Sequence, residues 1–190
     1  ESPSTHTRTG GAVNSAYAET FVVPNDFPAL LTETPTTEDE GDLFETAGAS
    51  GEARVICYSP DHSLTLARMD DRGRAAVVDC WCDLSADLGR KWAHVQLFEN
   101  KGAMMGASSP HPHGQVWASD FVPQIVAQED VHQREHHART GKVLLDAVAA
   151  AEAGTGERVV EETGSWLVVV PHWAAWPFET LLIARSPVAR

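Results

Sequence analysis

Apolar and polar residues alternate in short runs along most of the chain, which is typical of strands with one buried face. This alternation predicts strands early in 19–31 and at 53–59, 94–100, 114–119 and 178–185, and a hairpin over 157–173 that turns at Thr163-Gly164. Helical spacing occurs at 72–89, which ends on Gly89, and at 127–153, with an interruption near Gly141. This order predicts an α+β fold in which helices pack on one side of a largely antiparallel sheet.

The segment 31–52 breaks the pattern, because acidic and small polar residues replace the periodic apolar ones. Such a composition buries little apolar surface and therefore predicts a mobile acidic loop. The whole chain is long enough for a core of its own, since 190 residues with 43% hydrophobic content fall in the range of one domain. We therefore expect residues 1–190 to form a single domain.

Charge and composition narrow the class of partner. The formal net charge of −13 leaves few and scattered basic residues, which argues against a nucleic-acid partner. The longest apolar runs fall far short of the roughly 20 residues of a membrane helix, and the first residues lack the apolar core of a signal peptide. Three cysteines, Cys57, Cys80 and Cys82, are too few for a disulfide framework. These features predict a cytoplasmic protein with a small-molecule ligand and no membrane partner.

The stretch SSPHPHGQ at 108–115 carries the clearest chemistry. Each proline fixes its own φ and pushes the preceding residue toward an extended conformation, so His111 and His113 should face one way, with Gln115 beside them. A neutral imidazole can attack phosphorus, and an amide can donate a hydrogen bond to a phosphoryl oxygen. Because Gln115 cannot act as a general acid, the motif favours group transfer over hydrolysis. An isolated His-Pro-His could also be a solvated turn.

Two further groups have two interpretations each. His62, in SPDHS, could be a metal ligand or a turn residue that caps neighbouring backbone. Glu129, His132 and His136 are spaced i, i+3 and i+7 on one helix face, as in Glu-x-x-His metal motifs. A solvated polar face has the same spacing, and for the two histidines we favour it.

Four stretches, in order along the chain, resemble one known family: NDFPAL at 25–30, RVICYSPDHS at 54–63, FENKGAMMGASSPHPHGQVWAS at 98–119 and VVPHWAAWPFETLL at 169–182. The family is galactose-1-phosphate uridylyltransferase, of the histidine-triad superfamily. The resemblance implies a histidine-triad-like half-barrel and a homodimer. It also implies an exchange of UMP between UDP-glucose and galactose 1-phosphate by double displacement.

The resemblance also implies roles for particular residues. Three are catalytic: His113 as the nucleophile that carries UMP, Gln115 as a hydrogen-bond partner of the phosphate, and Ser108 as a phosphoryl contact. The substrate site also includes Asn25, Asp26, Phe27, Val55, Asn100 and the backbone around Gly106. His62 and His111 match two zinc ligands, and Glu129 matches a ligand of a second metal, iron or zinc.

The sequence departs from the family pattern in three places. The family's zinc is completed by a C-x-x-C pair ahead of the uridine site, where residues 1–8 contain no cysteine. The second metal takes histidines from a C-terminal half, which we expect to be absent because the chain stops at Arg190. Ala107 and Ser109 stand where the family commonly has Cys and Asn. Two alternatives follow: a related nucleotide-sugar phosphorylase, or a non-catalytic remnant that binds nucleotide or metal.

Overall fold

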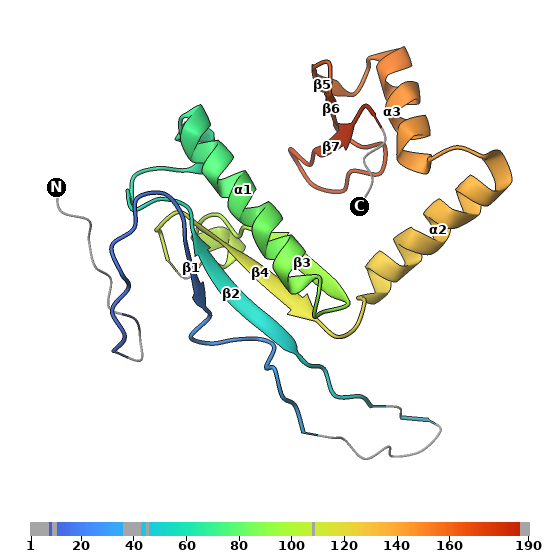
Figure 1. Cartoon of the computed structure of the whole chain (residues 1–190). Coiled ribbons are helices and arrows are strands. Elements are labelled where there is room, and N and C mark those ends of the chain that lie inside the picture. The colour runs from blue at the N-terminus through green and yellow to red at the C-terminus, as the bar shows by residue number, and fades with distance from the viewer. Residues whose placement is uncertain (1–7, 9–10, 36–42, 45, 108, 187–190) are drawn as a thin grey trace. The chain divides into compact units, whose positions relative to one another are not determined.

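The computed structural model describes residues 8, 11–35, 43–44, 46–107 and 109–186 of the chain. The chain divides into two compact units, Glu1–Pro123 and Gln124–Arg190. Each unit has its own antiparallel sheet (Figure 1), and the buried apolar side chains form one cluster in each unit. The length predicted one domain, whereas the apolar residues gather into two separate cores.

Four antiparallel strands form the sheet of the first unit: β1 (Phe21–Pro24), β2 (Gly51–Cys57), β3 (His94–Phe98) and β4 (His113–Ser119). Their order is β1-β2-β4-β3, so β4 is an inner strand although it comes last in this unit. The helix α1 (Asp71–Leu88) connects β2 to β3, with the short 3₁₀ helix η1 (Leu66–Arg68) before it. A second short 3₁₀ helix, η2 (Ala103–Met105), lies between β3 and β4.

Figure 1 shows α1 across one face of the sheet of the first unit, and the core residues of this unit come mainly from α1 and from the sheet. α1 begins where the Asp70 side chain accepts a hydrogen bond from the Gly73 backbone N–H (2.8 Å), and it ends at Gly89. Its buried side chains pack with those of the sheet, and the fully buried members include Val77 of α1, Ile56 of β2 and Val116 of β4.

The opposite face of this sheet carries polar residues of the histidine motif. In β4, residues 114, 116 and 118 are buried, so His113 and Gln115 project from the other face because side chains alternate along a strand. The register places His113 opposite Cys57 and Gln115 opposite Val55 on β2. The two polar side chains therefore stand on a strand that is hydrogen-bonded on both sides.

The described part of the second unit, residues 124–186, contains two helices and three strands: α2 (Gln124–Thr140), α3 (Leu144–Thr155), β5 (Val159–Glu162), β6 (Trp166–Val169) and β7 (Leu181–Ala184). Gly141, with a φ of 69°, separates the helices at the predicted interruption. The strands lie in the order β5-β6-β7, and Ala149 of α3 packs on them in the core. Glu152, only 5% exposed, forms an ion pair with Arg158 (3.0 Å).

The predicted α+β class with antiparallel strands is confirmed. The predicted loop 31–52 extends too far, because Gly51 and Glu52 already belong to β2 and pair with β4. Residues 36–42 and 45 of this loop lie outside the described part, and its mobility stays a prediction. Within the described ranges, no helix is both long enough and apolar enough to cross a membrane.

Glu52 shows why β2 begins earlier than predicted. Its carboxylate accepts hydrogen bonds from Arg54 (2.7 Å), Lys91 (2.9 Å) and Trp92 Nε1 (3.2 Å). The hydrogen bond from Arg54 is the main cause that lowers the pKa of Glu52 from 4.5 to about 2, against the opposing effect of burial. Such a carboxylate stabilises the fold above its ordinary pKa, and this stabilisation is lost as the pH falls toward the lower value.

Replacing this carboxylate should therefore flatten the acid side of the stability profile. Between about pH 6 and about pH 3, the free energy of unfolding of the wild-type chain should fall by about 2 kcal/mol more than that of Glu52→Gln, measured by urea titration. Glu33→Gln is the control, because Glu33 is exposed. An equal pH dependence of the wild type and Glu52→Gln would contradict the assigned role.

Candidate active site

The loop between β3 and β4 carries the histidine motif to the sheet. Gly102 and Gly106 flank η2 with φ values of 87° and 82°, a region that glycine enters without strain. The chain then bends at 110–112 and enters β4 at His113. The Pro112 carbonyl accepts a hydrogen bond from the Tyr58 backbone N–H (2.9 Å). The end of the loop is thereby tied to the chain just beyond β2.

A backbone carbonyl orients the ring of His113. Nδ1 of His113 lies 2.7 Å from the carbonyl oxygen of His111. A carbonyl can only accept, so Nδ1 carries a proton and donates it, and the lone pair of the neutral ring is at Nε2. Nε2 of His113 is therefore the atom that can act as a nucleophile.

The ring of His111 makes different contacts. Its Nδ1 lies 2.9 Å from Nδ1 of His62, and the two ring centroids are 4.3 Å apart. Its Nε2 lies 3.0 Å from the hydroxyl oxygen of Tyr17. The structure thus brings together the two histidines that the resemblance assigns to zinc. It adds Tyr17, a lone aromatic residue in a polar stretch that has no sequence pattern to mark it.

The two imidazoles fit two corners of a zinc tetrahedron. Zn–N bonds of about 2.0–2.1 Å place two nitrogen ligands about 3.3 Å apart, so only a small outward movement of these rings would be needed. A structural zinc takes four ligands. Across the part of the chain that the structure describes, no group of three or more His, Cys, Asp or Glu residues could hold a metal. His62 and His111 therefore supply half of a tetrahedral set.

The prediction that His111, His113 and Gln115 share one extended face is wrong for His111. The chain bends through 110–112, and the backbone N–H of His111 donates to the Ser109 hydroxyl (3.3 Å) as in a turn. Only His113 and Gln115 lie on the strand and share its face. The bend sends the His111 ring to Tyr17 and His62 instead.

The side chain of Gln115 is held by Asn25, which follows β1. Nδ2 of Asn25 donates to Oε1 of Gln115 (3.4 Å). The backbone N–H of Asn25 in turn donates to the carbonyl of Ala53 on β2 (2.9 Å), which fixes the position of Asn25. Because Oε1 of Gln115 accepts this bond, its NH₂ group is left as a hydrogen-bond donor.

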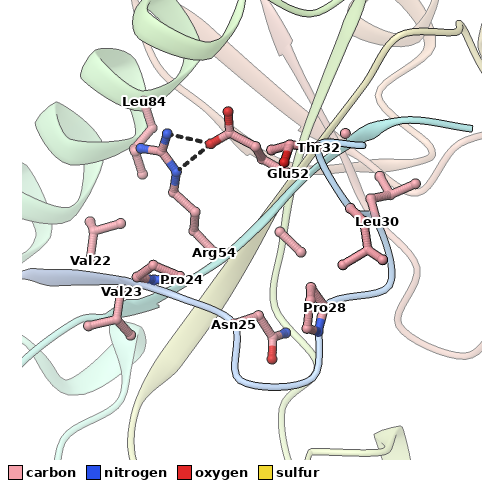
Figure 2. A pocket seen from close by; sticks show the side chains of 13 residues that line it. Val22, Val23, Pro24, Asn25, Pro28, Leu30, Thr32, Glu52, Arg54 and Leu84 are labelled. Atoms are coloured by element: carbon pink, nitrogen blue, oxygen red, sulfur yellow. Dashed lines mark hydrogen bonds and ion pairs between the residues drawn. The ribbon is translucent and has the colours of Figure 1, made fainter. Parts of the chain in front are cut away.

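A cavity of about 540 Å³ lies beside Asn25 (Figure 2). Its walls are mostly apolar and come from β1, the segment 28–32, β2 and Leu84 of α1. Figure 2 also shows the ion pair of Arg54 and Glu52 among the lining side chains. Its volume falls in the range of small-molecule sites. Asn25 belongs to this cavity and also contacts Gln115, so it connects the two.

The other predicted substrate residues of the first unit are placed as follows. Val55 lies opposite Gln115 in the register of β2 and β4. Arg8 donates to the carboxylate of Asp26 and to the carbonyl of Pro24, an ion pair that the sequence did not indicate. Phe27 is 76% exposed, and its backbone N–H donates to Oδ1 of Asn25 (2.9 Å).

Four predicted residues remain. Asn100 and Gly106 belong to the loop after β3, where Asn100 is half-buried and Gly106 exposed. Ser108 lies outside the described residues. Glu129 is exposed on α2 and belongs to the second unit.

Burial shifts the pKa of two groups near the histidines. It raises the pKa of the Tyr17 phenol and of the Cys57 thiol. Both groups therefore stay neutral at pH 7 and place no negative charge beside an anionic ligand. Burial also raises the pKa of Glu99, while the charge of Lys101 acts in the opposite direction.

Gly114, between the two polar residues, is required by the packing of Tyr58. A Cβ at this position would lie 2.0 Å from the Tyr58 hydroxyl oxygen and 3.0 Å from the carbonyl oxygen of Phe98. Tyr58 is 2% exposed and packs edge to face on Trp81. Its hydroxyl has no hydrogen-bond partner in the described part of the chain. Position 114 of the motif is therefore a glycine because the Tyr58 side chain fills the space that a Cβ would need.

Two family models match the sequence. The one described as galactose-1-phosphate uridyl transferase, N-terminal domain, matches residues 3–123, and the one for the C-terminal domain matches residues 128–190. The chain belongs to this uridylyltransferase family. The join between the two models falls where the structure divides, after Pro123. The C-terminal domain of the family therefore begins within this chain and not beyond Arg190.

Curated galactose-1-phosphate uridylyltransferases align with nearly the whole chain. The protein from Haemophilus influenzae is 47% identical over 184 residues, which are 96% of this chain and 53% of the relative. The protein from Rattus norvegicus is 44% identical over 185 residues, which are 97% of this chain and 49% of the relative. The chain spans about half the length of the curated relatives it matches.

Solved structures share the fold. A uridylyltransferase mutant superimposes with a TM-score of 0.83 at 24% identity, covering 93% of this chain and 57% of that one. An ADP-glucose phosphorylase from Arabidopsis thaliana, solved with bound ADP-glucose, has a TM-score of 0.72 at 25% identity, covering 90% of this chain and 52% of that one. Uridylyltransferases and a nucleotide-sugar phosphorylase thus have the same fold as this family member.

Gly114→Ala should destabilise the chain by about 1–3 kcal/mol, because the added methyl group overlaps Tyr58. Adding Tyr58→Phe removes the hydroxyl oxygen and should restore part of the loss, which a double-mutant cycle of urea unfolding measures. Gly164→Ala is the control, since its added Cβ meets open space. The packing explanation fails if Gly114→Ala unfolds at the wild-type urea concentration.

Proposed function

We propose that the chain transfers the uridylyl group between UDP-glucose and galactose 1-phosphate through a covalent intermediate on His113. The observation that carries the proposal is the hydrogen bond from Nδ1 of His113 to the carbonyl of His111 (2.7 Å), because it leaves the lone pair on Nε2. Membership of the family supports the choice of substrates.

In the first half-reaction, the Nε2 lone pair of His113 attacks the α-phosphorus of UDP-glucose. The Nε2–P bond forms while the bond from phosphorus to the bridging oxygen breaks, and glucose 1-phosphate leaves with that electron pair. No proton changes place. The ring becomes positively charged, and the hydrogen bond from Nδ1 to the His111 carbonyl stabilises that charge.

In the second half-reaction, a phosphate oxygen of galactose 1-phosphate attacks the same phosphorus. The Nε2–P bond breaks, its electron pair returns to His113, and UDP-galactose leaves. The NH₂ group of Gln115 donates to a phosphoryl oxygen in both steps, oriented by Asn25. An amide does not act as a general acid or base near neutral pH, so this position does not assist hydrolysis.

The proposed uridine site is built from residues after β1, in β2 and in the loop between β3 and β4. It comprises Asn25, Asp26, Phe27, Val55 and Asn100, with Ser108 and the backbone at Gly106 on the phosphates. Three contacts support the grouping. The Asn25 side chain donates a hydrogen bond to Gln115 and accepts one from the Phe27 backbone N–H, and Val55 lies opposite Gln115 in the pairing of β2 with β4. We also propose a homodimer, as the resemblance implies, and a cytoplasmic location, because all three cysteines are free thiols.

The proposed metal roles are limited by the donors present. His62 and His111 would hold zinc, which when bound would cross-link the segment of His62 to the bend before β4. Glu129 stays a proposed ligand of a second metal, iron or zinc. Within the described residues nothing completes that second site, and no step of the mechanism uses it.

Two alternatives remain with an observation behind each. A nucleotide-sugar phosphorylase is favoured by the fold shared with the ADP-glucose phosphorylase. It would take adenosine in place of uridine and inorganic phosphate as the acceptor. A non-catalytic remnant is favoured by the two histidines that make only half of a zinc set. Both alternatives can be tested in one experiment.

The intact mass of the chain should increase by one UMP after a brief incubation with UDP-glucose. It should return to the starting value when galactose 1-phosphate is added. His113→Asn should form no adduct, because an amide is not a nucleophile. His137→Asn, on the exposed surface of α2, is the matched control and should behave as the wild type.

Three outcomes of the mass measurement contradict the proposal. An AMP adduct from ADP-glucose that inorganic phosphate removes would favour the phosphorylase. No adduct from either nucleotide sugar, in a sample shown to be folded by circular dichroism, would favour the remnant. A UMP adduct that persists in His113→Asn would place the nucleophile elsewhere.

Gln115→His should raise the hydrolysis of the UMP adduct relative to transfer by about tenfold or more, because an imidazole can exchange protons with water. The measurement is the loss of the adduct mass with time, with and without galactose 1-phosphate. Gln96→His, on the neighbouring strand β3, is the control for a new imidazole near the site. An unchanged ratio in Gln115→His would remove the role given to this amide.

A further inference from the structure

The hydroxyl of Tyr17 lies between a backbone carbonyl and the ring of His111. It donates to the carbonyl oxygen of Ser59 at 3.1 Å and lies 3.0 Å from Nε2 of His111. Its ring stacks on Phe21 of β1, with centroids 5.1 Å apart and planes 15° apart. The stacking and the bond to Ser59 hold the hydroxyl in place independently of His111.

Counting protons fixes the direction of each bond. A phenol has one proton to donate, and a carbonyl can only accept, so the Tyr17 proton goes to Ser59. Its bond with Nε2 of His111 then requires Nε2 to carry a proton and donate to the phenol oxygen. The lone pair of the neutral His111 ring is therefore at Nδ1, the atom that lies 2.9 Å from Nδ1 of His62.

We propose that Tyr17 is a positioning residue that holds His111 as the Nε2–H tautomer, with its Nδ1 lone pair directed at His62. His111 and His113 then have opposite tautomers although they are two residues apart. A carbonyl accepts from Nδ1 of His113, and a phenol accepts from Nε2 of His111. One ring presents Nε2 for covalent chemistry, and the other presents Nδ1 as a ligand.

This arrangement has a consequence for metal binding, which rests on the zinc site of the proposed function. A ligand ring whose second nitrogen is already bonded needs no reorientation to bind the metal. His62 differs, because it is exposed and its Nδ1 must donate toward His111 in the metal-free chain. A metal bound between the two Nδ1 atoms therefore requires His62 to change tautomer, whereas His111 is already in the required form.

The test uses Tyr17→Phe, which keeps the aromatic ring for stacking on Phe21 and removes only the hydroxyl. Tyr58→Phe is the matched control, because Tyr58 is the other of the two tyrosines and its hydroxyl has no hydrogen-bond partner in the described part of the chain. Long-range ¹H–¹⁵N correlation spectra of the metal-free chain report the tautomer of His111 directly. Competition with a chromophoric chelator measures the affinity for zinc alone.

In the wild type and in Tyr58→Phe, we expect His111 as a single Nε2–H tautomer whose Nε2 proton exchanges slowly with water. In Tyr17→Phe, that slow proton should be lost, and the zinc dissociation constant should rise about tenfold. Circular dichroism confirms that each variant is folded. Should Tyr17→Phe fail to fold, the tautomer of His111 in the wild type still decides the matter.

The outcomes separate this inference from the proposed zinc site. A wild-type His111 that is protonated at Nδ1, or a slow Nε2 proton that survives in Tyr17→Phe, overturns the role of Tyr17, even if zinc binds. A wild type that binds no zinc but loses the slow proton in Tyr17→Phe supports the role of Tyr17 and removes the zinc site. Weaker zinc binding without a change at Nε2 also overturns the inference.

Discussion

The pairing of β4 between β2 and β3 is the constraint on which the site depends. A shift of this strand by one residue would expose the fully buried Val116 and turn His113 into the core, because side chains alternate between the two faces. The apolar contacts with α1 therefore determine the register of β4, and the register determines which imidazole stands on the opposite face. One face of β4 packs in the core, and the opposite face carries His113 and Gln115.

The features that the sequence predicted well have their cause within a few residues. The helical period and Gly89 predicted a helix at 72–89, and α1 spans Asp71–Leu88. Gly141 interrupts a helical stretch in the sequence and separates α2 from α3 in the structure. The strand after the histidine motif was found to within one residue at its start. In each case the residues that predicted the helix or strand lie within that helix or strand or at its end.

The features that the sequence did not indicate depend on residues far apart. Tyr17 and His111 are separated by 94 positions, and neither has a neighbour that marks the contact. The chain bends at 110–112, where the Pro112 carbonyl accepts a hydrogen bond from the distant Tyr58 backbone N–H, and local residue preferences did not predict this bend. The number of apolar residues does not show how they are distributed in space, so the composition could not distinguish one hydrophobic core from two. The meeting of His62 with His111 was predicted only through the family resemblance.

The group that orients His113 is the main-chain carbonyl of residue 111, and this affects how the site can vary in evolution. An orienting side chain can be deleted by one codon change, but every residue at position 111 brings the same carbonyl. A change of His111 would remove an imidazole that contacts His62 and Tyr17, while the acceptor for His113 would stay in the backbone. Loss of the proposed zinc ligand at position 111 and loss of the proposed nucleophile at position 113 are therefore genetically separable in this chain, although the two positions lie within three consecutive residues.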